Sequence, residues 1–232
     1  MCGIIGFTGR KPAKDILIDG LERLEYRGYD SAGIALLNDD DTLTIRKKAG
    51  RVSELRELCK DGDYSSTCGI GHTRWATHGG VTDANAHPHR CGNVALIHNG
   101  IIENYSDIIR EYGLADKLVS ETDSEVVAAL LDTLYDGDPI AAIRKAVKII
   151  AGSFALCIMF ADRPGIIYAV RNVSPMVAAH SEEGSIIASD LTAIISFSKD
   201  YFVVPEYHIL TMTQEGIRVE DLKGNEVKPQ ML

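Results

Sequence analysis

The N-terminus of the chain carries the residue with the most specific chemistry. Cys2 stands between Met1 and Gly3, and its small side chain favours removal of Met1, which would leave a thiol and a free α-amine on one residue. A free α-amine titrates near ~7.7 to 8.0 and a thiol near ~8.5, so moving a proton from sulfur to nitrogen costs only about 1 kcal/mol. The sequence therefore predicts a nucleophile that carries its own base. The alternative is an ordinary buried cysteine at the start of a strand, since a single cysteine is weak evidence for catalysis.

A pair of opposite charges could bind an amino acid beside that nucleophile. Arg74, next to the single tryptophan Trp75, has a planar guanidinium that matches the two oxygens of a carboxylate. Asp123 could bind an ammonium group on the other side of the ligand. Each residue also has a plainer explanation, because Arg74 could be a surface arginine packed against an aromatic ring and an acid at a helix start is favourable through the dipole alone.

The dipeptide Asn99-Gly100 allows two interpretations. Between strands it is the strongest two-residue hairpin signal, so a turn is the first expectation. Placed against a nucleophile, the Asn99 amide and the Gly100 N–H could instead donate to a developing oxyanion. The sequence leaves both open.

A metal site is a weaker hypothesis. Six potential ligands lie between residues 68 and 91, namely Cys68, His72, His78, His87, His89 and Cys91. Their spacings match no pattern of a structural zinc site. We therefore expect neither a metal nor another cofactor.

The elements that must position these residues follow from the apolar periodicity. Strands are expected at 2–8, 32–37, 42–48, 67–75, 94–98, 153–160, 165–170, 176–180, 185–188, 207–213 and 217–220. Helices are expected from Pro12 to about residue 24 and at 52–60, 122–134, 138–150 and 191–197, and an irregular or helical segment at 105–112. Strands in runs with grouped helices favour an α+β fold with antiparallel sheets and one domain over residues 1–222, followed by a polar tail or linker at 223–232.

The composition narrows the class of partner. The chain has 232 residues, 45% of them hydrophobic, which is enough for a packed core. A net charge of −9 without a basic run argues against nucleic acid or an anionic membrane as a partner. The absence of a signal-peptide pattern and the odd number of cysteines, five, predict a cytoplasmic protein with reduced thiols.

Five motifs stand in order along the chain: MCGIIG at 1–6, YRGYDSAG at 26–33, GHTRWATHG at 71–79, NAHPH at 85–89 and HNG at 98–100. Together they resemble the glutaminase domain of the glutamine–fructose-6-phosphate aminotransferase family, among the class II glutamine amidotransferases. At the position of Tyr29-Asp30 in this chain, the purine-pathway members of the class are expected to have Gln-Asp, so the resemblance is to the aminotransferase family instead. The resemblance implies the N-terminal nucleophile hydrolase fold, a four-layer αββα sandwich of two antiparallel sheets.

The resemblance also implies how the reacting atoms are arranged. Cys2 would attack the side-chain amide of L-glutamine, and hydrolysis of a γ-glutamyl thioester would yield glutamate and ammonia. Asn99 and Gly100 match the oxyanion hole of the family, and Arg27 matches an arginine beside the nucleophile.

The remaining roles implied by the resemblance concern binding. Arg74 would bind the glutamine carboxylate and Asp123 its amino group. Thr77 and His78 would lie in a loop that closes over the substrate, and Trp75 matches the residue that gates the ammonia channel.

The family continues into a sugar-isomerase portion that uses the ammonia to make glucosamine 6-phosphate from fructose 6-phosphate, and nothing in residues 1–232 resembles it. We expect an excised domain of a longer, homo-oligomeric synthase, or a short protein that works with a separate partner. A different hypothesis is a glutamine-sensing module in which Met1 is retained and Cys2 is blocked.

Overall fold

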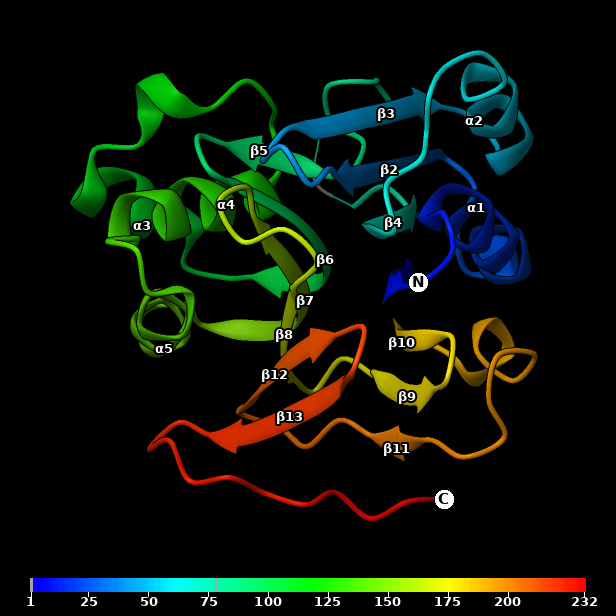
Figure 1. Ribbon diagram of the computed structural model, residues 1–232. Helices are drawn as coiled ribbons and strands as arrows, with labels where there is room; N and C mark the ends of the chain where they lie inside the picture. The colour runs from blue at the N-terminus through cyan, green and yellow to red at the C-terminus, as the bar shows by residue number, and fades with distance from the viewer. Residues whose placement is uncertain (1, 78) are drawn as a thin grey trace.

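A computed structural model describes residues 2–77 and 79–232, and its strands form two antiparallel sheets (Figure 1). The seven-stranded sheet contains, in spatial order, β11 (Phe202–Val203), β9 (Val177–Ser181), β10 (Gly184–Ala188), β1 (Gly3–Gly9), β4 (Cys68–Arg74), β2 (Ser31–Leu37) and β3 (Leu43–Ala49). The six-stranded sheet contains β13 (Gly216–Asp221), β12 (His208–Thr213), β8 (Ile167–Asn172), β7 (Gly152–Phe160), β6 (Val94–Ile102) and β5 (His89–Cys91).

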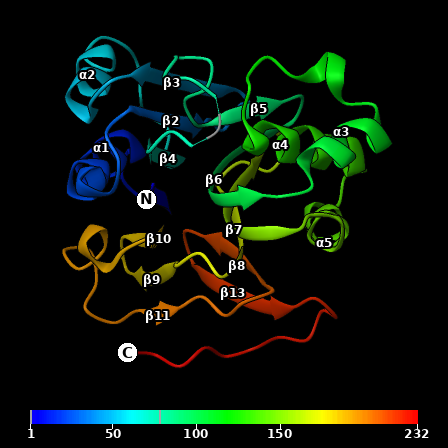
Figure 2. The same cartoon turned by 180° about the vertical axis from the view of Figure 1, so that it is seen from behind.

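Helices cover the outer face of each sheet (Figures 1 and 2). On the seven-stranded sheet these are α1 (Ala13–Leu24) and α2 (Val52–Leu58), with the short 3₁₀ turns η1 (Glu25–Arg27) and η3 (Leu191–Ala193). On the six-stranded sheet they are α3 (Tyr105–Tyr112), α4 (Asp123–Leu134) and α5 (Pro139–Ile149), and the 3₁₀ turn η2 (Ala115–Lys117) follows α3.

The hydrophobic core has three parts, one between each pair of layers. The central part lies between the two sheets and contains Ile4 and Ile70 from one sheet and Ile97 and Cys157 from the other. The outer parts lie between each sheet and its helices. Helices, sheet, sheet and helices therefore follow one another, and the predicted α+β sandwich of two antiparallel sheets is confirmed.

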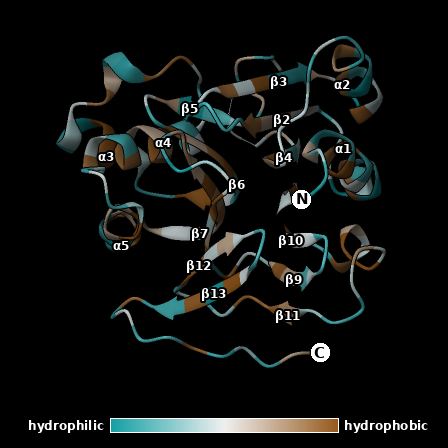
Figure 3. Ribbon diagram, in the orientation of Figure 1, coloured by the Kyte–Doolittle hydropathy of each residue, from teal (hydrophilic) through white to brown (hydrophobic). Residues whose placement is uncertain are grey.

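Local sequence explains most of these elements. The Thr122 hydroxyl accepts a hydrogen bond from the Glu125 N–H at 3.2 Å, which caps α4. Asp138 caps α5 in the same way, through the N–H of Ala141 at 3.0 Å. Strand β2 is buried along its whole length, whereas β3 at the sheet edge is only partly buried and contains both hydrophobic and hydrophilic residues (Figure 3).

The main departure from the predicted elements is at Asn99-Gly100. Strand β6 runs straight through both residues to Ile102, and Asn99 and Gly100 pair with Ala155 and Phe154 of β7. The expected hairpin turn is therefore wrong. Gly100 has φ +131°, and a side chain there would run into the carbonyl oxygen of Ser153, so only glycine suits this position.

Smaller departures lie in short or irregular segments. Strands β5 and β11 were not expected, and the helix expected at 191–197 is reduced to η3. In the segment 223–232, the N–H of Val227 donates to Val219 at 2.9 Å and that of Leu232 to Tyr201 at 2.8 Å. No helix in the described part of the chain combines the length and the apolar character that crossing a bilayer demands.

Candidate active site

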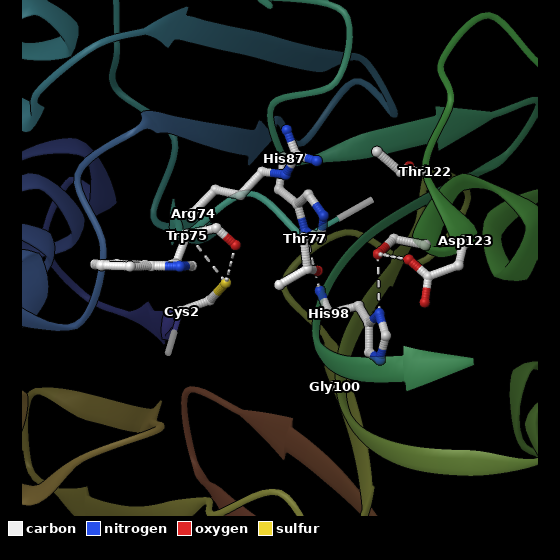
Figure 4. A pocket seen from close by; sticks show the side chains of 10 residues that line it. Cys2, Arg74, Trp75, Thr77, His87, His98, Gly100, Thr122 and Asp123 are labelled. Carbon is white, nitrogen blue, oxygen red and sulfur yellow. Dashed lines mark hydrogen bonds between the residues drawn. The ribbon is translucent and has the colours of Figure 1, made fainter. Parts of the chain in front are cut away.

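Cys2 immediately precedes β1, and its side chain lies against the backbone of Trp75 (Figure 4). The Trp75 N–H donates to the Cys2 Sγ at 3.2 Å, and the Trp75 carbonyl accepts from the thiol at 3.6 Å. Burial raises the pKa of the Cys2 thiol, while the Trp75 N–H and the nearby Arg74 charge act in the opposite direction. The backbone of Trp75 can therefore contact the sulfur in both its protonated and its ionised form.

The carbonyl of Cys2 is fixed by two donors. Arg27 Nε donates to it at 3.2 Å and Asn99 Nδ2 at 3.0 Å. Arg27 is in turn held by an ion pair with Asp190, Nη1 to Oδ2 at 3.0 Å. Because these three partners come from three distant segments, the position of the nucleophile depends on the packing of the whole fold.

Asn99 and Gly100 lie beside the nucleophile, where they can act as hydrogen-bond donors. An amide NH₂ group carries two hydrogens. One hydrogen of Asn99 binds the Cys2 carbonyl, which leaves the second for an oxygen atom that develops charge next to Sγ. The glycine lines the same space.

Two buried residues of opposite charge face the same pocket (Figure 4). Arg74, at the end of β4, is 4% exposed, and its Nη1 donates to the Gly80 carbonyl at 3.0 Å. Burial lowers the pKa of Arg74, but an arginine stays protonated at neutral pH. Asp123, the first residue of α4, is 5% exposed and accepts from the Ile102 N–H at 2.7 Å. The pocket therefore offers a cation and an anion to a zwitterion.

Two adjoining pockets share Cys2, Trp75, Thr77 and Gly100 in their linings. The first contains Arg74 and Asp123 and has a volume of about 20 Å³, the space of one or two water molecules. The second contains Arg27, Asn99, Ile101 and Pro175 and has a volume of about 300 Å³. An amino acid would therefore fit between Arg74 and Asp123 only after part of the lining moves outward.

Every described residue to which the sequence analysis gave a catalytic or glutamine-binding role lines one or both pockets. These residues are Cys2, Arg27, Arg74, Trp75, Thr77, Asn99, Gly100 and Asp123. Met1, whose removal would free the α-amine, and His78, expected in the closing loop, lie outside the described residues. The sequence interpretation missed Asp190, which holds Arg27, and the pocket residues Thr122 and Ser124. Thr122 had a local signal only as a helix cap.

The described histidines that were considered as metal ligands use their ring nitrogens for hydrogen bonds within the protein. The His72 Nε2 lies 3.0 Å from the His98 carbonyl, the His87 Nδ1 accepts from the His98 N–H at 3.2 Å, and the His89 Nε2 lies 3.0 Å from the Thr122 hydroxyl. The rings of His72 and His87 stack face to face, with centroids 4.0 Å apart. Among residues 2–77 and 79–232, no group of side chains is arranged to hold a metal ion.

Several known proteins are similar to this chain in sequence. The family model for a glutamine amidotransferase domain matches residues 72–196. The glutamine–fructose-6-phosphate aminotransferase (isomerizing) of Fusobacterium nucleatum is 44% identical over 237 residues, and that of Clostridium tetani 41% identical over 235 residues. Each alignment covers 100% of this chain, which spans 39% and 38% of the length of these relatives, respectively.

The similarity extends to solved structures. Glutamine phosphoribosylpyrophosphate amidotransferase from B. subtilis superposes with a TM-score of 0.83 at 24% identity, over 97% of this chain and 50% of that one. This similarity supports the fold, and the family model covers more than half of the residues. The chain therefore belongs to the glutamine amidotransferase domain family.

Proposed function

We propose that this chain hydrolyses the side-chain amide of L-glutamine to glutamate and ammonia, with Cys2 as the nucleophile. The observation that carries the proposal is the pocket in which the Cys2 thiol lies with a buried cation, Arg74, and a buried anion, Asp123. That set of charges fits the α-carboxylate and α-ammonium of an amino acid and leaves its side chain to reach the sulfur.

In the first half of the reaction the Cys2 sulfur attacks the δ-carbon of glutamine. A C–S bond forms, and the electron pair of the C=O bond moves to oxygen, where the Asn99 amide and the Gly100 N–H stabilise the charge. Once Met1 is removed, the α-amine of Cys2 takes the thiol proton and delivers it to the leaving nitrogen. The C–N bond breaks, ammonia leaves and a γ-glutamyl thioester remains.

Water completes the cycle. It attacks the thioester carbon while the α-amine takes one of its protons, and the same two donors stabilise the second oxyanion. The C–S bond breaks, the proton returns to the thiolate and glutamate is released. The enzyme is regenerated without a cofactor or redox step.

The other residues act on binding and position. Arg74 binds the α-carboxylate and Asp123 the α-ammonium, while Arg27 holds the Cys2 carbonyl. Thr77 and His78 belong to the segment that closes over glutamine. Trp75, whose side chain is 48% exposed, stands where ammonia leaves the pocket.

The names of the relatives suggest where the ammonia goes. Glutamine–fructose-6-phosphate aminotransferases are more than twice as long as this chain. In our proposal this domain supplies nitrogen to a sugar-isomerase portion that converts fructose 6-phosphate into glucosamine 6-phosphate, in a cytoplasmic homo-oligomer.

Intact-mass analysis with a glutamine analogue that alkylates thiols tests the proposal. We expect protein without Met1 to gain one label, mapped to Cys2 and prevented by excess glutamine. The Cys2→Ala variant should release no glutamate, whereas Cys91→Ala, a matched control at a half-buried thiol outside the pocket, should retain wild-type activity. Wild-type glutamate release by Cys2→Ala would overturn the proposal, and retained Met1 with an unlabelled Cys2 would favour the glutamine-sensing alternative.

A further inference from the structure

The hydrogen bond between His72 and Asn99 joins the two sheets directly behind the nucleophile. His72 lies in β4 and is 0% exposed, and Asn99 lies in β6. We propose that His72 is a positioning residue that fixes the Asn99 amide with its NH₂ group toward Cys2. This inference rests on the proposed function, in which that NH₂ group stabilises the oxyanion.

The position of the ring proton follows from the contacts. The His72 Nε2 lies 3.0 Å from the His98 carbonyl and 3.0 Å from the Asn99 Oδ1. A backbone carbonyl can only accept a hydrogen bond, so Nε2 must carry the hydrogen. This one hydrogen is shared between the His98 carbonyl and the Asn99 Oδ1, so His72 donates toward Asn99 in a bifurcated hydrogen bond.

The orientation of the Asn99 amide follows from its two neighbours. On one side stands the His72 Nε2–H, which requires an acceptor, and on the other the Cys2 carbonyl, which requires a donor. A flipped amide would place oxygen against oxygen and N–H against N–H, losing both bonds. The contacts at the oxygen and at the nitrogen of the Asn99 amide therefore favour the same orientation, with the NH₂ group beside the nucleophile.

The surroundings of His72 keep it uncharged. Burial lowers the pKa of His72 to about 3, and it outweighs the hydrogen bonds to Asn99 and to the His98 carbonyl, which act in the opposite direction. The ring stacks on His87, which is itself held by the His98 N–H. A neutral ring has one N–H, and Nδ1 has no hydrogen-bond partner among the described residues. The single proton is thus committed to Nε2.

A pair of substitutions separates this role from simple packing. His72→Gln keeps an N–H donor at similar reach, whereas His72→Met fills the space without a donor. Removing an oxyanion donor outright costs about 10²- to 10³-fold in kcat, so misplacing it should cost about 30-fold in His72→Met. The KM for glutamine should change less than about twofold, because Arg74 and Asp123 are untouched. His72→Gln should recover most of the loss.

A γ-aldehyde analogue of glutamine gives a second measurement. Its carbon bonds to the Cys2 sulfur and its oxygen takes up the thiol proton, occupying the oxyanion position. The Ki should rise in parallel with the loss of kcat in His72→Met. The control is His180→Gln, a histidine of β9 that contacts Ser185 outside both pockets, for which kcat and Ki should stay within about twofold. Unchanged kcat in His72→Met, or equal losses in all three variants, would overturn the inference.

Nitrogen NMR of the wild-type imidazoles tests the position of the His72 ring proton, and hence the orientation of the Asn99 amide, without an activity measurement. The His72 ring, assigned by its loss in His72→Gln, should show a protonated Nε2 and an unprotonated Nδ1. A protonated Nδ1 would contradict the inference even if His72→Met fails to fold. If the wild-type chain does not hydrolyse glutamine, the proposed function fails, and the ring nitrogens still report whether His72 fixes Asn99.

Discussion

Two walls of the pocket differ in what fixes their polar groups. The strand wall contains Cys2, Asn99 and Gly100. The loop wall is the described part of 75–85 together with 119–122, of which Trp75, Thr77 and Thr122 line the pocket. On the strand wall, the Cys2 carbonyl binds two donors and the Asn99 amide is bonded at both ends. These groups lie in or beside paired strands. Their geometry exists before a substrate arrives.

On the loop wall the residues that make the contacts are more exposed. The described residues from 79 to 84 are all exposed, and Glu121 joins this loop to the segment before α4 by accepting from Asn85 Nδ2 at 3.0 Å and the Gly80 N–H at 3.3 Å. Lys47 anchors the far end of the loop through the carbonyls of Ala84 and Ala86, at 3.1 and 2.8 Å. Because its residues are exposed rather than paired in a sheet, this wall can move more readily than the strand wall. Changes in the strand wall should therefore act on kcat, and changes around the loop wall on KM.

The largest effect after loss of the nucleophile is expected for Asn99→Ala on the strand wall. The substitution removes the side-chain donor to the oxyanion, so kcat should fall by about 10²- to 10³-fold while the KM for glutamine changes little. Steady-state kinetics of glutamate release provide the measurement, with the exposed Asn225→Ala as control. A rise in KM with unchanged kcat would place Asn99 in substrate binding and break the division between the walls.

The next effect is expected for Asp123→Asn, at the junction of α4 with the loop wall. The amide oxygen can still accept from the Ile102 N–H, so the helix start should survive, but the charge that pairs with the α-ammonium is lost. Removing one partner of a buried pair costs about 2 to 5 kcal/mol, so KM should rise by at least about 30-fold.

An analogue of glutamine without the α-amine makes this test specific. The wild-type chain should prefer glutamine over the analogue, and Asp123→Asn should lose most of that preference. If the preference persists, Asp123 does not bind the ammonium group.

The pH dependence of alkylation tests the electrostatics of the strand wall. Burial raises the pKa of the Cys2 thiol, so in protein that retains Met1 the thiolate is a minor species at pH 7. Because only the thiolate reacts, alkylation by iodoacetamide should rise about tenfold per pH unit between pH 7 and 9. In protein without Met1 the α-ammonium of Cys2 favours the thiolate, so the rise should level off at lower pH. Identical profiles in the two forms would contradict the amine base.

The elements that the sequence predicted well are those with local signals. The caps Thr122 and Asp138 mark the starts of α4 and α5 because each bonds an N–H three residues away. Asn99-Gly100 misled the prediction because its local signal is a turn, whereas pairing with Ala155 and Phe154, more than fifty residues away, keeps it in a strand. Strands β5 and β11 are too short to show a period.

The candidate site divides in the same way. Residue type alone suggested Arg74 and Asp123 as an opposite pair, and the motifs supplied the order of the others. The sequence could not show that Asp190 holds Arg27, because 163 positions separate them. Nor could it show the His72 contact with Asn99, which exists only because the two sheets pack face to face. The supporting contacts, rather than the reacting groups, thus required the structure.

The smallest effect is expected for Glu121→Gln on the loop wall. The amide can still accept from Asn85 or Gly80, but the loss of charge weakens both bonds at an exposed position where such contacts contribute little. The KM for glutamine should therefore rise by about twofold with kcat unchanged, and Glu111→Gln on the exposed face of α3 should leave both constants at wild-type values. A fall in kcat comparable to that of Asn99→Ala would mean that the loop wall positions the reacting atoms, and the two walls would then act as one unit.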